Sequence, residues 1–437
     1  MLQHLELDYV GPTRHMELDF APRLNVITGD NGLGKSFILD LVWWCLTRTW
    51  SGPVARPWIG PKSLIESVRN EQPNIIFTFQ FEGGSPFSRK STYCFEQPPK
   101  SAWPLPDLRR RNSELVVYAR IDGGFSVFDP VGTQIQEIMR TFYGGSGETR
   151  YNFTQETLMH GLSYDNNRVC NGLIADWEKW RLSDSPNFTL LGKILETLSE
   201  SEEAPLTLGP SIRIIDDVRD IPTIEMPYGL VPITDTSSGM RRILGLAYLL
   251  VWAWSEHQVA AKQRRQGVTD SFVFLVDEIE AHLHPRWQRH ILPAILKAVK
   301  LLSPEIKVQV IAVTHAPLVL TSVEPEFDLE QDKLFLLDMK GQDVVAEEIL
   351  WTKQGDANAW LTSKVFGLKE AGNIPQEKAI LAAMAWMRGN TANLPKDMNT
   401  QDAIDQALRK HLPSVDPVWV QWHMFKRRQA QGGSKAP

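Results

Sequence analysis

The stretch that decides the fold is Leu24–Leu46, LNVITGDNGLGKSFILDLVWWCL. The apolar run that opens it predicts a short buried strand, and the apolar residues that close it predict a helix. The eight residues between them match the pattern GxxxxGK[ST] in full: Gly29, Asp30, Asn31, Gly32, Leu33, Gly34, Lys35 and Ser36. Glycines let a backbone turn its N–H groups inward around a phosphate, and a helix that starts there directs its positive end at the same anion. The stretch therefore predicts a phosphate-binding loop.

The side chains of this loop have separate predicted roles. We expect Lys35 to reach the β- and γ-phosphates of a bound nucleotide and the Ser36 hydroxyl to bind Mg²⁺. Phe37, the next residue, is expected to join the loop in binding the nucleotide. A chance glycine-rich turn is the alternative, but the strand before the loop and the helix after it supply the context that the motif requires.

A second apolar run, Phe272–Val276, ends in two acidic residues, Asp277 and Glu278. Its unbroken apolar character is typical of a parallel strand that is buried on both faces. Because ligands of open α/β sheets bind at the carboxyl ends of strands, Asp277 is expected to hold the Mg²⁺ complex, directly or through water. Glu278 is placed to polarise the attacking water. Alone, this pair would indicate only an acidic strand end that faces solvent.

A third apolar run, Val308–Val313, predicts the next strand and ends in Thr314-His315. At the end of such a strand, His315 could contact a γ-phosphate oxygen, or it could cap the following helix. We favour the phosphate contact because this strand follows the acidic strand by one helix.

A polar segment, Thr236–Met240 (TSSGM), precedes an apolar helix and has the composition of an anion-binding helix start. With this segment, the order GDNGLGKS, TSSGM, FLVDE and VTH resembles that of an ABC-type ATPase head. The continuation DEIEAHLHP is similar to that of the SMC-like and OLD-like ATPases. The resemblance covers Met1 to about Trp351 and implies ATP as the nucleotide.

The resemblance also implies a composite site between two subunits. TSSGM stands where these ATPases have the signature LSGGQ, which covers ATP bound to a second head packed head-to-tail. It implies that Ser237 and the N–H of Gly239 contact ATP on another subunit, although Ser238 and Met240 depart from the signature. A glutamine beside the metal is implied as well. Gln80 and Gln155 are both candidates, and Gln155 is favoured because it precedes a helical segment that leads toward the signature.

Composition and patterning give the expected organisation. The 437 residues carry a net charge of −6 and include three cysteines, whose number and spacing do not indicate disulfides. The longest apolar run has 12 residues, too few to span a membrane. We therefore expect a cytoplasmic protein that does not enter a membrane. We expect an α/β fold: an ABC/SMC-type P-loop ATPase head with a mixed β-sheet core over 1–351, interrupted by a helical insertion over about 82–228. A helical region, 352–437, follows and is expected to end in a disordered tail.

Three segments are similar to those of ATPase subunits from bacterial anti-phage systems of the Septu type: SSGMRRILGLAYLLVWAWSEHQ, CNGLIADW and DPVWVQW. That resemblance implies a homo-oligomer, a head-to-tail dimer or higher, and a separate HNH-type nuclease partner (PtuB-like). A basic cluster, 109–111, could contact DNA or another nucleic acid, or it could be a solvated loop. An SMC-like DNA repair or recombination ATPase is the alternative, and the absence of sustained heptads counts against it.

Overall fold

The computed structural model describes residues 1–58, 72–80, 86–97, 102–104, 113–132, 151–164, 167–201, 203–215, 217–392 and 394–432. Internal contacts divide the chain into two units, Met1–Gly355 and Asp356–Pro437. The division falls close to the boundary expected after Trp351.

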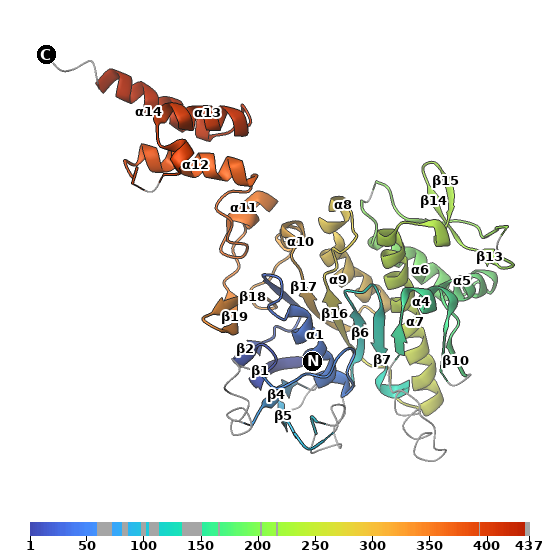
Figure 1. Cartoon of the computed structure of the whole chain (residues 1–437). Coiled ribbons are helices and arrows are strands. Elements are labelled where there is room, and N and C mark those ends of the chain that lie inside the picture. The colour runs from blue at the N-terminus through green and yellow to red at the C-terminus, as the bar shows by residue number, and fades with distance from the viewer. Residues whose placement is uncertain are drawn as a thin grey trace. The chain divides into compact units, whose positions relative to one another are not determined.

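The first unit is built on a sheet whose strands follow the order β19-β18-β3-β17-β16-β6-β7-β8 (Figure 1). Neighbours from β18 to β6 pair in parallel, and the strands at both edges pair antiparallel, so the sheet is mixed as expected. The strands are β3 (Leu24–Gly29), β6 (Leu115–Ala119), β7 (Phe125–Phe128), β8 (Tyr151–Phe153), β16 (Ser271–Asp277), β17 (Lys307–Val313), β18 (Asp332–Lys340) and β19 (Asp343–Ile349).

A second, antiparallel sheet has the order β2-β1-β4-β5. Its strands are β1 (Leu2–Val10), β2 (Thr13–Asp19), β4 (Asn74–Phe79) and β5 (Phe87–Thr92). Helix α1 (Lys35–Thr47) packs between the two sheets, because its apolar residues share one buried cluster with Leu5 and Leu7 of β1 and with Val273 and Leu275 of β16. The helix that follows the phosphate loop is therefore fixed on both sides.

The opposite face of the large sheet is contacted by α7 (Ser238–Arg264) and α9 (Ile291–Leu302). Side chains that alternate with the α1-facing ones, such as Phe272 and Phe274, are fully buried there. The remaining helices of this unit are α4 (Gln155–His160), α5 (Leu173–Leu182), α6 (Pro186–Thr197), α8 (Pro285–Gln288), α10 (Pro317–Val323) and the 3₁₀ turn Ile233–Asp235. Among the helices described, none combines the length and apolar character needed to cross a bilayer.

The expected helical insertion, 82–228, differs from what the structure contains. Helices α4, α5 and α6 lie in it, but so do β6, β7 and β8, which belong to the central sheet. Strand β6 pairs in parallel with β16, with Leu115 beside Phe272 and Ala119 beside Val276. The bounds expected for the insertion are therefore too wide, because sequence patterns do not show which distant strands pair. Short strands also lie there or follow: β9 (Leu162–Tyr164), β10 (Asn167–Cys170), β11 (Thr207–Leu208), β12 (Ile212–Arg213), β13 (Asp220–Ile221), β14 (Thr223–Met226) and β15 (Gly229–Pro232).

The second unit is helical, with α11 (Ala357–Thr362), α12 (Ile374–Met387), the 3₁₀ turn Lys396–Met398, α13 (Gln401–His411) and α14 (Val418–Gly432). Trp422 is fully buried in a cluster with residues of α12 and α13, and Trp419 and Phe425 pack against that cluster. The aromatic residues of this helix thus pack inside their own unit. Helix α14 continues to Gly432, and the expected disordered tail stays a prediction.

Candidate nucleotide-binding site

The phosphate loop joins β3 to α1, and its backbone has the left-handed geometry that glycine permits. Gly34 precedes α1 with φ 86°, and Gly29 has φ 138°. A Cβ at position 29 would lie 2.3 Å from the carbonyl oxygen of Leu337 in β18. A side chain at position 29 would therefore require both a strained backbone and a shift of the neighbouring strand. Local packing, and not only phosphate contact, requires this glycine.

Lys35 lies folded over its own loop. Its Nζ donates to the carbonyl oxygens of Gly29 (3.0 Å) and Asp30 (2.7 Å), and the residue is 5% exposed. Burial lowers the pKa of the Lys35 ammonium, while Glu278 and Asp30 act to raise it. A buried ammonium that bonds only to carbonyl oxygens can exchange those bonds for stronger, charge-assisted bonds to phosphate.

Phe37 has a different position from the rest of the loop. Its ring lies against Gly11 in the β1–β2 turn, since a Cβ at position 11 would meet the ring at 2.4 Å. The side chain of Phe37 therefore packs the loop onto the second sheet, and its main-chain N–H lies in the first turn of α1. The contact of Phe37 with a nucleotide stays a prediction.

Register brings the acidic strand to the same edge as the phosphate loop. Asp277 lies beside Val313 of β17, which lies beside Ile27 of β3, so the three strands end together. Burial raises the pKa of the Asp277 carboxyl to about 6, and a hydrogen bond from Ser36 opposes that shift. Oδ1 of Asp277 is buried and has no hydrogen-bond partner among the described residues. A carboxylate oxygen held beside a hydroxyl is a donor set that fits Mg²⁺, which prefers oxygen ligands.

Glu278 and His315 face each other across this edge. Oε1 of Glu278 is 3.5 Å from Nε2 of His315, and both side chains are 29% exposed. Glu278 has φ 46°, a left-handed conformation that is uncommon outside glycine and is often found at functional sites. Burial, followed by the charge of Lys35, lowers the pKa of His315. A neutral imidazole can accept or donate one proton beside the Glu278 carboxylate.

The two candidate glutamines lie near opposite ends of the parallel strands, Gln155 at the carboxyl ends and Gln80 near the amino end of β17. Gln155, the first residue of α4, reaches over Gly123 in the turn after β6, next to the carboxyl end of β16. Gln80 instead bonds through its N–H to the carbonyl oxygen of Met1, and Leu2 in turn bonds to Gln309 near the start of β17. Of the two, only Gln155 lies at the edge that carries the phosphate loop.

The segment Thr236–Met240 forms the start of α7. Ser237 is the residue that caps the helix, with its hydroxyl accepting the N–H of Met240 at 3.2 Å, and it is exposed. Gly239 is buried against the carbonyl oxygen of His282, at 2.5 Å from where a Cβ would stand. Ser237 is thus exposed with its hydroxyl engaged in the helix cap, while Gly239 packs on the turn that follows the acidic strand.

Sequence reasoning missed two charged residues near the carboxyl end of β16, the buried Arg242 and the half-buried Glu280. Arg242 is 3% exposed, and its Nη2 donates to the carbonyl oxygens of Asp277 (2.9 Å) and Arg120 (3.5 Å). Glu280 accepts hydrogen bonds from Thr314 and His315, the two residues that follow β17. A signal for Arg242 was present, because it lies three residues after Gly239 and four before Leu246, on the buried face of the helix.

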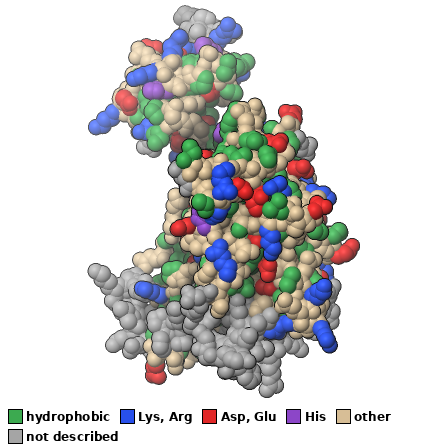
Figure 2. Space-filling model, turned by 90° about the vertical axis from the view of Figure 1, so that its right-hand side faces the viewer, with side chains coloured by type: hydrophobic (Ala, Val, Ile, Leu, Met, Phe, Trp, Pro, Cys, Tyr) green, Lys and Arg blue, Asp and Glu red, His purple; other side chains and the backbone are tan. Residues whose placement is uncertain are grey.

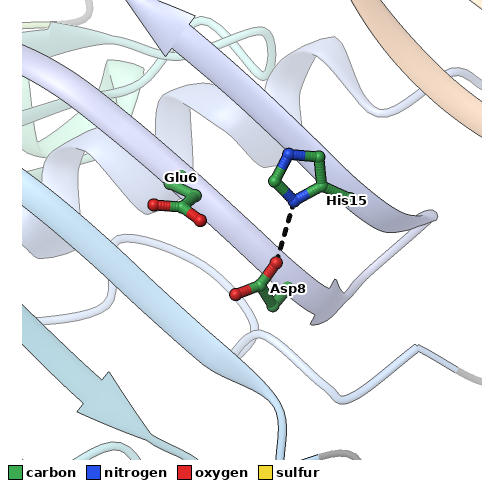
Figure 3. Close-up of side chains that lie close together, drawn as sticks. All are labelled: Glu6, Asp8 and His15. Atoms are coloured by element: carbon green, nitrogen blue, oxygen red, sulfur yellow. Dashed lines mark hydrogen bonds and ion pairs between the residues drawn. The ribbon is translucent and has the colours of Figure 1, made fainter.

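A separate cluster of ionisable side chains lies on β1 and β2, outside this site. Figure 3 shows Glu6, Asp8 and His15, with His15 Nδ1 at 2.9 Å from Asp8 Oδ1. His15 also pairs with Glu17 through Nε2 at 3.1 Å. The hydrogen bond to Asp8 raises the pKa of His15. These partners account for the cluster as cross-strand pairing on an exposed sheet face.

The basic cluster at 109–111 lies outside the described residues. On the face that Figure 2 shows, Lys and Arg side chains are interspersed with Asp and Glu over the described surface. This part of the molecule therefore gives no support to a nucleic-acid groove.

Comparison with known proteins gives two matched regions. Residues 4–156 match a family model described as an AAA domain, and residues 227–321 match the model "AAA domain, putative AbiEii toxin, Type IV TA system". The Septu protein PtuA of Bacillus mycoides (strain KBAB4) is 30% identical over 137 residues, which are 31% of this chain. The match spans 17% of that protein's length.

Two solved structures are similar over most of this chain. They are the SMC head domain from Thermotoga maritima, with a TM-score of 0.40, and the SmcHead bound to the C-winged helix domain of ScpA, with a TM-score of 0.42. Each is 14% identical and covers 80% of this chain, and the alignments cover 99% and 98% of those chains.

The two AAA models divide the site between them. The first contains the phosphate loop, and the second contains the start of α7, the acidic strand and His315. The structure brings these segments to one edge of a mixed α/β sheet. The chain therefore carries the two AAA-domain segments of a P-loop ATPase, and over 31% of its length it is similar to the Septu protein PtuA.

Proposed function

We propose that the chain binds ATP with Mg²⁺ at the carboxyl edge of β3, β17 and β16 and hydrolyses it there. The observation that carries this proposal is the register of Ile27, Val313 and Asp277, which supports a single site for the groups that follow the three strands. Bound Mg²⁺ would neutralise charge on the phosphates and orient them.

The residues have distinct roles in the proposed reaction. Lys35 and the N–H groups from Gly29 to Phe37 bind the phosphates. Ser36 and Asp277 hold Mg²⁺, with Gln155 beside it. Glu278 orients the water that attacks the γ-phosphate, and His315 contacts a γ-phosphate oxygen next to that water.

Glu278→Gln tests this proposal. ATP turnover is expected to fall about 10²–10⁴-fold, because the carboxylate that orients water is lost. ATP binding, measured by calorimetry, should remain, because Lys35 and Asp277 are unchanged. Glu305→Gln is the matched control, since Glu305 is exposed just before β17 at the other end of the sheet. Turnover equal to the wild-type rate in Glu278→Gln would show that Glu278 has been given the wrong role, and turnover that persists in EDTA would exclude a role for Mg²⁺.

The head-to-tail dimer is the second part of the proposal. The exposure of Ser237 at the start of α7 supports it, because a helix start that faces solvent can receive the phosphate of another subunit. Ser237 and the N–H of Gly239 would cover ATP held by the partner copy. ATP-dependent dimerisation can be measured by light scattering of Glu278→Gln with and without ATP.

The cellular role is proposed from the partial likeness to PtuA. We propose that ATP-driven dimerisation controls a separate HNH-type nuclease (PtuB-like) in anti-phage defence. The test is co-purification with the product of the neighbouring gene, followed by nuclease assays of each component and of the pair. Metal-dependent DNA cleavage by the purified chain alone, unchanged by Lys35→Ala, would contradict a separate nuclease.

A further inference from the structure

The turn after β16 carries a third carboxylate, Glu280, that has no role in the proposed reaction. The N–H of Ala281 donates to the carbonyl oxygen of Glu278 (2.9 Å), and the N–H of Leu283 donates to that of Glu280 (2.9 Å). These two turns, together with the left-handed backbone at Glu278, fold the chain back toward β17. Glu280 is thereby brought to the end of the neighbouring strand.

One oxygen of Glu280 bonds to both residues that follow β17. Oε1 accepts the hydroxyl of Thr314 at 2.8 Å and the main-chain N–H of His315 at 2.6 Å. The same Thr314 hydroxyl oxygen accepts the N–H of Ala316 at 3.0 Å, and the N–H of Thr314 donates to Ile27 of β3. A single carboxylate therefore fixes the chain segment that carries the His315 imidazole.

The surroundings of the Glu280 carboxylate are unfavourable for its charge. Burial raises the pKa of Glu280, whereas the bonds from His315 N–H and Thr314 favour its ionised form. Its second oxygen, Oε2, is buried without a hydrogen-bond partner within the described parts of the chain. A buried carboxylate oxygen with no partner costs stability, and such groups are concentrated at functional sites.

We propose that Glu280 is a positioning residue for His315. It holds the main chain of Thr314 and His315 so that the imidazole faces Glu278 and the γ-phosphate, and it does not touch the nucleotide. Small displacements of a reacting group lower rates strongly, so this restraint is expected to affect turnover more than binding. The inference rests on the proposed function, because ATP hydrolysis is the reaction that His315 serves.

Two variants separate the acceptor from the charge. Glu280→Gln keeps an oxygen that can accept both bonds, and its kcat is expected within about threefold of the wild-type value. Glu280→Leu removes the acceptor, and its kcat should fall about tenfold or more, with a smaller change in KM for ATP. Equal losses in both variants would contradict the proposal, because charge alone would then explain them.

A double-mutant cycle tests whether Glu280 acts through His315. If it does, adding Glu280→Leu to His315→Ala should cause no further loss of turnover, because the group it positions is already gone. Losses that multiply in the double variant would overturn the proposal. If Glu280→Leu does not fold, Thr314→Val replaces it in the cycle. This variant removes the hydroxyl donor to Glu280 and leaves the bond from the His315 N–H in place. The loss of turnover in Thr314→Val should be smaller, and it must likewise vanish in the His315→Ala background.

A readout without hydrolysis distinguishes this inference from the proposed function. The ring proton signals of His315 in the nucleotide-free chain, assigned by their loss in His315→Ala, should move in Glu280→Leu and stay in Glu280→Gln. Unmoved signals in Glu280→Leu would overturn the positioning role, even if the chain hydrolyses ATP. Moved signals in a chain that fails to hydrolyse ATP would support the positioning of His315 and contradict the proposed function.

Discussion

At the scale of the residue, the candidate site is a set of ionisable groups kept in conditions unlike water. Lys35 is buried against carbonyl oxygens, Asp277 is buried beside Ser36, and Glu278 has a left-handed backbone. A phosphate can offset the cost of burying Lys35, and a metal ion that of burying Asp277, because each ligand supplies the missing opposite charge. We therefore expect a bound phosphate or metal ion to affect these side chains more strongly than they affect one another.

Lys35→Ala is expected to weaken ATP binding, because it removes the side-chain cation of the phosphate loop. A charge-assisted bond of this kind is worth roughly 1.5–3 kcal/mol, so the dissociation constant should rise about 10- to 100-fold. Calorimetric titration of ATP measures this directly. Lys193→Ala on α6 is the control, since Lys193 is exposed on another element. An unchanged affinity in Lys35→Ala would mean that this loop does not bind the nucleotide.

At the scale of the element, local sequence patterns were enough to predict some segments but not to place others. The apolar runs before Asp277 and Thr314 predicted β16 and β17, and the residues after the phosphate loop predicted α1, because burial on both faces leaves a continuous apolar run. Local patterns could not decide whether Gln80 or Gln155 lies beside the phosphate loop. Their positions depend on pairings of β4 with β1 and of β6 with β16, which join residues far apart in the chain.

In the second unit, Asp405 joins two helices, and its contribution should depend on pH. It lies on α13 and accepts hydrogen bonds from Trp422 Nε1 (2.8 Å), from Lys426 of α14 and from Arg409 (2.7 Å). Although partial burial acts the other way, the bonds from Lys426, Arg409 and Trp422 hold the pKa of the Asp405 carboxyl well below its usual range. Its stabilising effect is therefore fully present above the unfolded-state pKa of about 3.9 and is lost as the pH falls below it.

Asp405→Asn should lower the stability of this unit by about 1–3 kcal/mol at pH 7. Hydrogen exchange of peptides from α13 and α14 should show faster exchange in the variant at pH 7, with the difference shrinking as the pH falls below about 4. Asp402→Asn, on the same helix and in its first turn, is the control. A difference between Asp405→Asn and the wild type that persists at low pH would show that the charge of Asp405 is not responsible.

At the scale of the whole molecule, the proposed ATP site is shared between two copies, and mixing of variants tests this. Ser237→Arg and Lys35→Ala should each be inactive alone. In a mixed two-fold dimer, the first supplies an intact phosphate loop and the second an intact Ser237, so one composite site is complete and part of the ATPase activity should return. The control replaces Lys35→Ala by a chain that carries both substitutions, which completes neither site. Failure to recover activity in chains proven to mix would mean that Ser237 acts within its own subunit.

The path of the chain out of the first unit has a mechanical consequence. Strand β3 ends in the phosphate loop and is bonded on one side to β18, which continues through the seven-pair ladder with β19 and then to Gly355. A load applied beyond Gly355 would reach the first unit at two places, at β19 and at Glu324, whose carboxylate accepts the main-chain N–H groups of Gln354 and Gly355. From β19 it would cross two rows of backbone hydrogen bonds before it reached Gly29, which packs on Leu337 of β18. We therefore expect tension beyond Gly355 to act on the shape of the phosphate loop only in so far as Glu324 does not carry it.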